Sequence, residues 1–92
     1  MEFSWDENKN ESNLIKHGLS FETAKLVFED PFHLSRIERV VEGEVRWQTI
    51  GMVEHVLLIL VAHTVSEDED SIRLISARRA SKKERRFYEQ GS

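Results

Sequence analysis

A run of seven consecutive apolar residues, VLLILVA at residues 56–62, sets the centre of the expected fold. The run is far shorter than the roughly 20 residues that a membrane-spanning helix requires. It shows no alternation of apolar and polar residues, which is typical of a strand that other structure covers on both faces. We therefore expect residues 56–64 to form the central strand of a sheet.

Three further segments rich in β-branched and aromatic residues surround this strand, at residues 34–41, 45–52 and 71–77. The turns between them are expected at residues 42–43, 53–54 and 66–70. Connections this short join only antiparallel neighbours, because a parallel crossover needs about a dozen residues. The four strands are therefore expected to form an antiparallel meander. Alternation along the strand expected at residues 45–52 places Arg46 and Trp47 on opposite faces.

Cap residues mark two N-terminal helices. The first is expected at residues 7–17, with Asp6 as its N-cap and Gly18 just past its end. The second begins after Ser20, keeps apolar residues at near-helical spacing, and stops at Asp30-Pro31. A short first strand before both helices is indicated by the alternation of apolar and polar residues at positions 3–6.

The C-terminal helix is expected at residues 82–89, where Ser81 and Glu84 have the spacing of a capping box. At 92 residues and 10.8 kDa the chain has room for one core, so we expect a single domain over residues 1–92. The expected fold class is α+β, with two N-terminal helices and a C-terminal helix packed on a small antiparallel meander sheet.

Several kinds of chemistry are excluded by composition. The chain has no cysteine, which excludes a disulfide framework, a thiolate nucleophile and a Cys-based zinc site. No two of its four histidines are four residues apart and no HExxH pattern occurs, so we expect neither a metal site nor a cofactor. The acidic N-terminus lacks the pattern of a signal peptide, and we expect a cytoplasmic protein that does not bind a membrane.

The charge of the chain is strongly asymmetric. Residues 1–70 hold 6 Lys and Arg against 15 Asp and Glu, whereas residues 71–92 hold 7 against 2. A basic element of this kind can neutralise phosphates locally although the whole chain carries a net charge of −4. The alternative is a solvated helix whose charges pair with the acidic body of the same chain.

Arginine and aromatic residues make RNA a candidate ligand. Guanidinium groups suit phosphate, and Trp47 and Tyr88 offer surfaces for base stacking. The arginines considered are Arg46, Arg73, Arg78, Arg79, Arg85 and Arg86. Each has an ordinary structural alternative, such as a core position for Trp47 or a salt bridge for Arg73.

Such a face can also cleave RNA, because RNA carries its own nucleophile in the 2′-OH. A protein then needs to align that group, remove its proton, stabilise the phosphorane and protonate the leaving 5′-oxygen, without any requirement for a metal. His17, His63, Glu44 and Tyr88 are all candidates for the proton transfers, and the sequence does not rank them. A histidine is the default choice, because its pKa lies nearest neutrality.

The chain resembles the BrnT family of bacterial type II toxins over nearly its whole length. The resemblance is carried by KHGLSF at residues 16–21 followed by Ala24, by RW at residues 46–47 with IG at residues 50–51, and by ISAR at residues 75–78. Two positions depart from the family pattern: Val45 stands where relatives often have an acid, and Arg79 where they often have Lys.

The resemblance implies a RelE-like fold and a metal-independent endoribonuclease that halts translation by cleaving RNA, on the ribosome or free. It also implies neutralisation by a cognate BrnA-like antitoxin, a ribbon-helix-helix protein through which the complex contacts operator DNA. The residues it carries over as catalytic are His17, Arg46, Arg78, Arg79 and Tyr88, and those for RNA binding are Lys9, Trp47 and Arg85. His17 has a structural alternative, since a histidine at a helix C-terminus interacts favourably with the helix dipole.

A second function class remains open at this stage. The basic C-terminal segment could dock on RNA or on an acidic protein and act by occupancy, without chemistry. Catalysis is favoured because the basic, aromatic and imidazole groups come from several separate elements, as a catalytic cleft needs.

Overall fold

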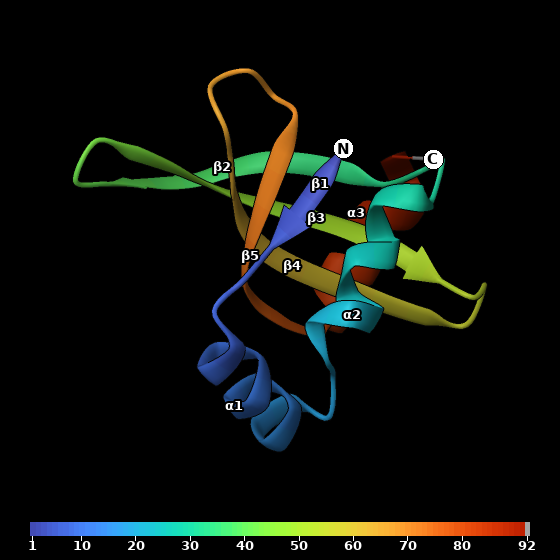
Figure 1. Ribbon diagram of the computed structural model, residues 1–92. Coiled ribbons are helices and arrows are strands. Elements are labelled where there is room, and N and C mark those ends of the chain that lie inside the picture. Colours follow the sequence, from blue (N-terminus) through green and yellow to red (C-terminus); the bar gives the residue numbers. More distant parts are fainter. Residues whose placement is uncertain (92) are drawn as a thin grey trace.

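The structure, a computed structural model, describes residues 1–91. The chain forms five strands, α-helices at both ends of the meander and one 3₁₀ helix (Figure 1). In chain order the elements are β1 (Glu2–Ser4), α1 (Glu7–His17), α2 (Phe21–Ala24), η1 (Lys25–Glu29), β2 (Leu34–Val41), β3 (Glu44–Val53), β4 (Leu57–Val65), β5 (Ser71–Arg79) and α3 (Lys82–Gly91). No helix within residues 1–91 combines the length and the apolar character needed to cross a bilayer.

The strands form one sheet in the order β1-β5-β4-β3-β2. The antiparallel meander from β2 to β5 is confirmed, and β4 lies at its centre as the apolar run predicts. The expectation of a purely antiparallel sheet is wrong, because β1 pairs with β5 in parallel, with Phe3 opposite Ile72. That pairing is possible because the helices and the rest of the meander lie between the two strands in the chain, which removes the short-connection constraint.

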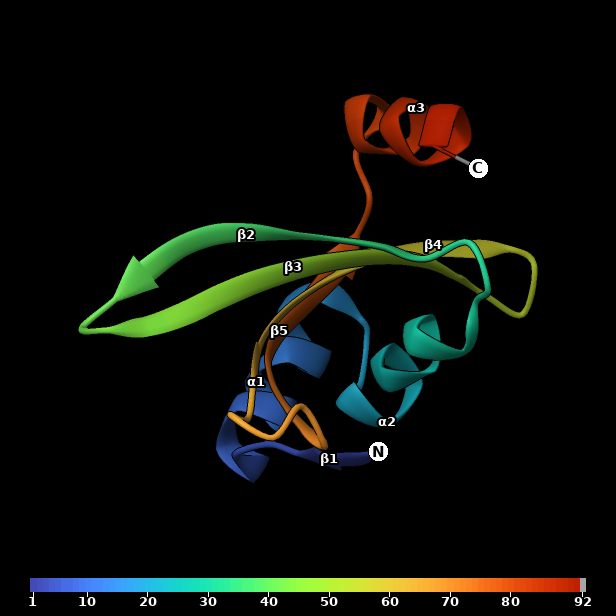
Figure 2. The same ribbon diagram turned by 90° about the horizontal axis from the view of Figure 1, so that it is seen from above.

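Helices cover both faces of the sheet (Figure 2). The larger core lies beneath α1, α2 and η1, on what we call the α1–α2 face, and contains Phe21, Val27, Ile59, Val61 and Leu74. The smaller core lies beneath α3, on what we call the α3 face, and contains Ile50, Leu58, Leu60 and Tyr88. Because side chains alternate along a strand, each strand residue is assigned to one of these two faces.

The first helix is held by buried amides as well as by apolar contacts. Asn13 is 6% exposed and pairs with the backbone of Ala77 on β5, donating to its carbonyl at 2.8 Å and accepting from its N–H at 3.0 Å. Its Nδ2 also donates to the carbonyl of Leu19 at 2.9 Å. These hydrogen bonds fix α1 along the part of β5 that β1 does not cover. The predicted cap residues, Asp6 and Gly18, are both in place.

The second N-terminal helix is shorter than expected. Ser20 caps α2 as predicted, but α-helical geometry ends at Ala24 and the segment continues as the 3₁₀ helix η1. Val27 of η1 lies directly against Gly51 of β3, where a Cβ atom would come within 2.7 Å of the Val27 carbonyl oxygen. Contact with the sheet therefore shapes this segment.

Val56 is the one residue of the apolar run that does not enter the sheet. It follows Glu54 and His55, whose φ angles of 55° and 61° are those of a tight hairpin turn, and it is 80% exposed. The central strand therefore begins at Leu57, one residue later than expected.

Candidate functional site

Strand alternation gathers arginine side chains on the α3 face of the sheet. Arg36 follows Leu34 by two residues on β2, and Arg46 precedes Ile50 by four on β3. On β5, Arg78 lies opposite Leu60. The arginines that share this side are Arg36, Arg39, Arg46, Arg73 and Arg78, which we call the arginine face.

One cross-strand row carries three of these arginines. Arg39 pairs with Arg46 between β2 and β3, and Thr64 pairs with Arg73 between β4 and β5. The register between β3 and β4, extended one residue beyond its Trp47 to His63 pair, places Arg46 beside Thr64. Neighbouring strands are about 4.8 Å apart. The row is therefore a line of positive charge that crosses four strands.

Arg46 has the most unusual surroundings in this row. Its Nε is buried and makes no hydrogen bond within residues 1–91. The same Nε has an ion-pair contact of 3.4 Å with the carboxylate of Glu44, two residues away on the same face, which does not meet hydrogen-bond geometry. A buried N–H without an acceptor is costly, and a ligand that supplies the acceptor removes that cost. Arg46 is therefore prepared to bind an anion.

Arg78 is held by α3. It donates two hydrogen bonds, of 2.8 and 2.9 Å, to the carboxylate of Glu84. Glu84 also closes the predicted capping box, accepting from the backbone N–H of Ser81 at 2.9 Å. The hydrogen bonds from Arg78 are the main reason that the pKa of Glu84 falls to about 2, and the same pairing raises the pKa of Arg78. This bidentate pair fixes the direction of the Arg78 guanidinium.

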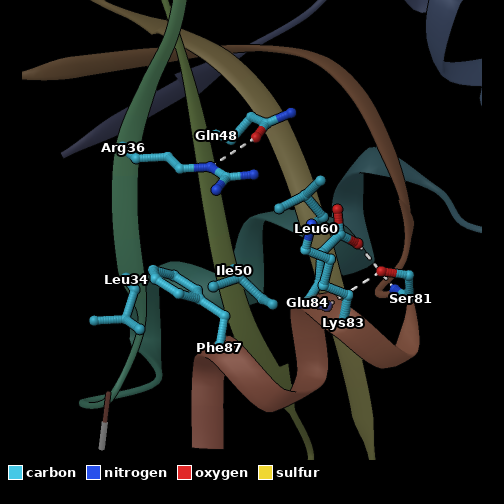
Figure 3. A pocket seen from close by; sticks show the side chains of 9 residues that line it. All are labelled: Leu34, Arg36, Gln48, Ile50, Leu60, Ser81, Lys83, Glu84 and Phe87. Carbon is cyan, nitrogen blue, oxygen red and sulfur yellow. Dashed lines mark hydrogen bonds between the residues drawn. The ribbon is translucent and has the colours of Figure 1, made fainter. Parts of the chain in front are cut away.

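A cleft of about 350 Å³ opens between α3 and strands β2 to β4, next to the arginine face (Figure 3). Leu34, Ile50 and Leu60 form its apolar part, and Phe87 of α3 and Arg36 of β2 also line it. The guanidinium of Arg36 is 5.7 Å from the centre of the Phe87 ring, and its Nε donates to Gln48 at 3.1 Å. An aromatic ring beside a cation in an open cleft suits a planar ligand.

Tyr88, predicted to be catalytic, lies on the buried side of α3 and is 7% exposed. Its hydroxyl donates to Asp30 at 2.5 Å, and the same carboxylate oxygen accepts from the backbone N–H of Met52 at 2.7 Å. Burial, together with the neighbouring carboxylate, raises the pKa of Tyr88 to about 12. This geometry supports a tether between α3 and the sheet, and it does not support proton transfer to a substrate.

Trp47 and His63 face the other side of the sheet. They form a cross-strand pair on the α1–α2 face, where His63 is 2% exposed and packs edge-on against Phe28 at 5.1 Å. Its Nε2 is 2.7 Å from the hydroxyl oxygen of Thr49. Burial lowers the pKa of His63 to about 4. His63 is thus a core residue, and Trp47 is separated by the sheet from Arg46, as alternation predicts.

The remaining predicted site residues lie off the arginine face. Arg79 pairs with Ile59, whose side chain belongs to the core beneath α1 and α2. Lys9 and His17 of α1 line a shallow pocket beyond the edge of β5. Arg85 is exposed on α3. The structure therefore places Arg46 and Arg78 on the same face of the sheet, in cross-strand rows that lie four residues apart along β4, and it leaves the other six predicted residues off the arginine face.

Sequence reasoning missed Arg36, Arg39 and Phe87. The signal for Arg36 was present, because it lies two residues from Leu34 in a strand that was correctly placed. Phe87 gives no such signal, since its position beside Arg36 depends on how α3 returns over the sheet. Within residues 1–91 no group of three or more His, Cys, Asp or Glu side chains is arranged to hold a metal ion.

Comparisons with known proteins agree with this fold. A family model described as the ribonuclease toxin, BrnT, of type II toxin-antitoxin systems matches residues 5–84. The structure is similar to the crystal structure of the Brucella abortus ribonuclease toxin BrnT, with a TM-score of 0.64 and 25% sequence identity. The similarity covers 89% of this chain and 99% of that chain. No match was found among curated proteins.

Proposed function

Since the chain belongs to the BrnT family of ribonuclease toxins of type II toxin-antitoxin systems, we propose that it is a metal-independent endoribonuclease that binds and cleaves RNA on its arginine face. The observation that carries the proposal is the row of arginines across the strands, in which the buried Nε of Arg46 makes no hydrogen bond and has an ion-pair contact of 3.4 Å with the Glu44 carboxylate. A phosphate oxygen is an acceptor of the right charge for this position.

Recognition of RNA is divided between the row and the cleft. Arg39, Arg46 and Arg73 follow the phosphates across the strands, and Phe87 with Arg36 holds a base by stacking. Arg78 adds positive charge, although Glu84 occupies two of its donors. Both parts lie on one side of the sheet, so a single RNA strand can contact them together.

Cleavage proceeds by attack of the RNA's own 2′-oxygen. Among the proton-transfer candidates from the sequence, Glu44 lies on the arginine face, 3.4 Å from Arg46 and with 57% of its side chain exposed. The Glu44 carboxylate removes the 2′-OH proton, the 2′-oxygen forms a bond to phosphorus, and the bond to the 5′-oxygen breaks. The leaving oxygen takes a proton from water, and the product is a 2′,3′-cyclic phosphate. Arg46 stabilises the charge of the phosphorane.

The cellular role follows from the family. Cleavage of RNA inhibits translation in the cytoplasm until a cognate antitoxin of the BrnA type, a ribbon-helix-helix protein that also contacts operator DNA, neutralises the toxin. The chain acts as one RelE-like domain over residues 1–92. The catalytic role predicted for Tyr88 does not enter this mechanism, because its hydroxyl is bound to Asp30 and the residue is buried beneath α3. The catalytic roles predicted for His17 and Arg79 and the RNA contacts predicted for Lys9, Trp47 and Arg85 do not enter it either, because these residues are not part of the arginine face.

The test is cleavage of a defined single-stranded RNA by the purified chain in the presence of EDTA. We expect cyclic-phosphate ends, and a rate lower by about 10²–10³ for Arg46→Ala, the typical cost of losing one donor to the transition state. Lys25→Ala is the matched control, since it removes one positive charge from η1, across the sheet. Arg79→Ala distinguishes the arginine face from the site that the family resemblance implies, because only the second includes Arg79. We expect this variant to cleave like the parent.

Three results would contradict the proposal. One is RNA left intact by the parent chain, both alone and with ribosomes. Another is loss of cleavage on removal of divalent metal. The third is an Arg46→Ala variant that is as active as the parent. Salt-sensitive binding of RNA that stays intact would instead support a module that acts by occupancy.

A further inference from the structure

The β2–β3 hairpin extends beyond the helices (Figures 1 and 2). Apolar side chains on it are exposed. On its α1–α2 face Ile37 pairs with Trp47, and Val40 pairs with Val45. Ile37 is 58% exposed, Val40 61% and Val45 36%. We call these four residues the hairpin patch. It lies on the opposite side of the sheet from the arginine face.

An acidic groove continues the hairpin patch at the tip of the hairpin. It lies between the β2–β3 turn and the β4–β5 connection and has a volume of about 520 Å³. Val45 and Val65 supply its apolar lining, and Glu42, Glu44 and Glu67 supply the carboxylates. Val45 belongs to both the patch and the groove, so the two form one continuous surface.

This surface has the character of a binding site for another protein. Cross-strand apolar pairs stabilise a sheet when they are covered, and contiguous exposed ones mark interaction surfaces. β2 is also an edge strand with an unpaired side, which natural proteins usually shield. The carboxylates select against a second copy of the same surface, because two acidic grooves repel each other. They favour a partner that carries Lys or Arg beside its apolar residues.

We propose that the hairpin patch and its acidic groove bind the antitoxin through an amphipathic segment. Its apolar side chains cover Ile37, Val40 and Val45, and its basic side chains pair with Glu42 and Glu67. That such a partner exists rests on the family to which the chain belongs. The docking chemistry comes from the residues of this chain.

Binding of the antitoxin in the acidic groove also explains how it inhibits RNA cleavage. This explanation rests on the proposed function. Glu44 lines the groove and is the proposed proton acceptor beside Arg46. A segment bound in the groove covers Glu44 and pairs with its carboxylate. Neutralisation therefore removes the base from use, while arginines that lie outside the groove need not be covered.

The experiment measures binding of the protein encoded by the reading frame next to this gene, together with RNA cleavage by each free variant. The Ile37→Ser/Val40→Ser double variant should bind about 30-fold more weakly, as expected when apolar anchors of an interface are lost. It should cleave RNA like the parent, because neither side chain faces the arginine face. Val56→Ser is the matched control, since Val56 is 80% exposed at the far end of β3.

Glu67→Lys is the second variant, and it tests the groove without changing the patch. We expect weaker binding whose salt dependence is smaller than that of the parent, and unchanged urea denaturation because Glu67 lies in an exposed turn. Equal affinity of the parent and of both variants would overturn the proposal. So would a parent chain that dimerises through Val40 in light scattering, or a parent that does not bind the neighbouring protein. These outcomes do not depend on whether the free chain cleaves RNA.

Discussion

Protonation of His63 should destabilise the fold at mildly acidic pH. His63 lies on β4 and points into the α1–α2 face, where it is 2% exposed and packs against the ring of Phe28. Burial lowers its pKa from the ordinary value of 6.5 to about 4, because a charged imidazole has little access to water there. The unfolded chain therefore binds a proton at this residue more readily than the folded chain does.

The size of the effect follows from the two pKa values. A group whose folded pKa is depressed contributes stability above its unfolded pKa and loses it as the pH falls toward its folded pKa. The full difference of about 2.5 pKa units is worth about 3 kcal/mol. Between about pH 7.5 and about pH 5.5 the expected loss is a little over 1 kcal/mol, and this interval lies above the range in which carboxylates titrate in unfolded chains.

Urea denaturation of the parent and of His63→Gln at these two pH values measures the effect. The free energy of unfolding of the parent should fall by about 1 kcal/mol more than that of the variant. The comparison uses the pH dependence of each protein, so a general destabilisation by the substitution does not affect it. Equal pH dependence in the two proteins would show that His63 is solvated in the folded state and would refute the reasoning.

Further predictions concern packing and hydrogen bonds. Asn13→Ala should lower the free energy of unfolding by about 2–4 kcal/mol in urea denaturation, because it leaves the backbone N–H and carbonyl of Ala77, in the part of β5 that β1 does not pair with, buried without partners; a loss below about 0.5 kcal/mol would contradict this role. Gly51→Ala should cost about 1–3 kcal/mol, since its Cβ would press on the Val27 carbonyl oxygen at 2.7 Å; unchanged stability would show that η1 can shift freely. Glu84→Ala should cost about 1 kcal/mol through the lost cap of α3, and it should strengthen RNA binding by releasing Arg78, which a filter-binding assay would detect; weaker binding would mean that Glu84 orients Arg78 for the ligand.

Local signals predicted most of the elements of this fold. Asp6, Ser20 and the Ser81 to Glu84 pair act within a few residues of their own positions, and all are in place as caps. The turns at Glu42-Gly43 and Glu54 also follow from local backbone preference. Short connections between the strands left only antiparallel neighbours, so the meander could be inferred before any long-range contact was known.

The placement of β1 could not be predicted in this way. Its partner Ser71 is separated from Glu2 by almost the whole chain, and a three-residue strand has no pattern that selects a partner or a direction. The change from α2 to η1 has the same origin. It depends on the close contact between Val27 and Gly51, which belong to different elements.

The candidate site was likewise predictable where local signals decide it and unpredictable where long-range contacts do. Alternation within one strand assigned Arg46 and Trp47 to opposite faces, and it also separates Arg78 from Arg79. Alternation alone did not show which side chains of neighbouring strands lie on the same side of the sheet. Register and the return of α3 over the sheet settle that, and they bring Arg36 beside Phe87 while leaving His17 beyond the edge of β5. Residue spacing fixes the chemistry along each strand, because it acts through covalent geometry, whereas the meeting of side chains from distant segments depends on the packing of the whole chain.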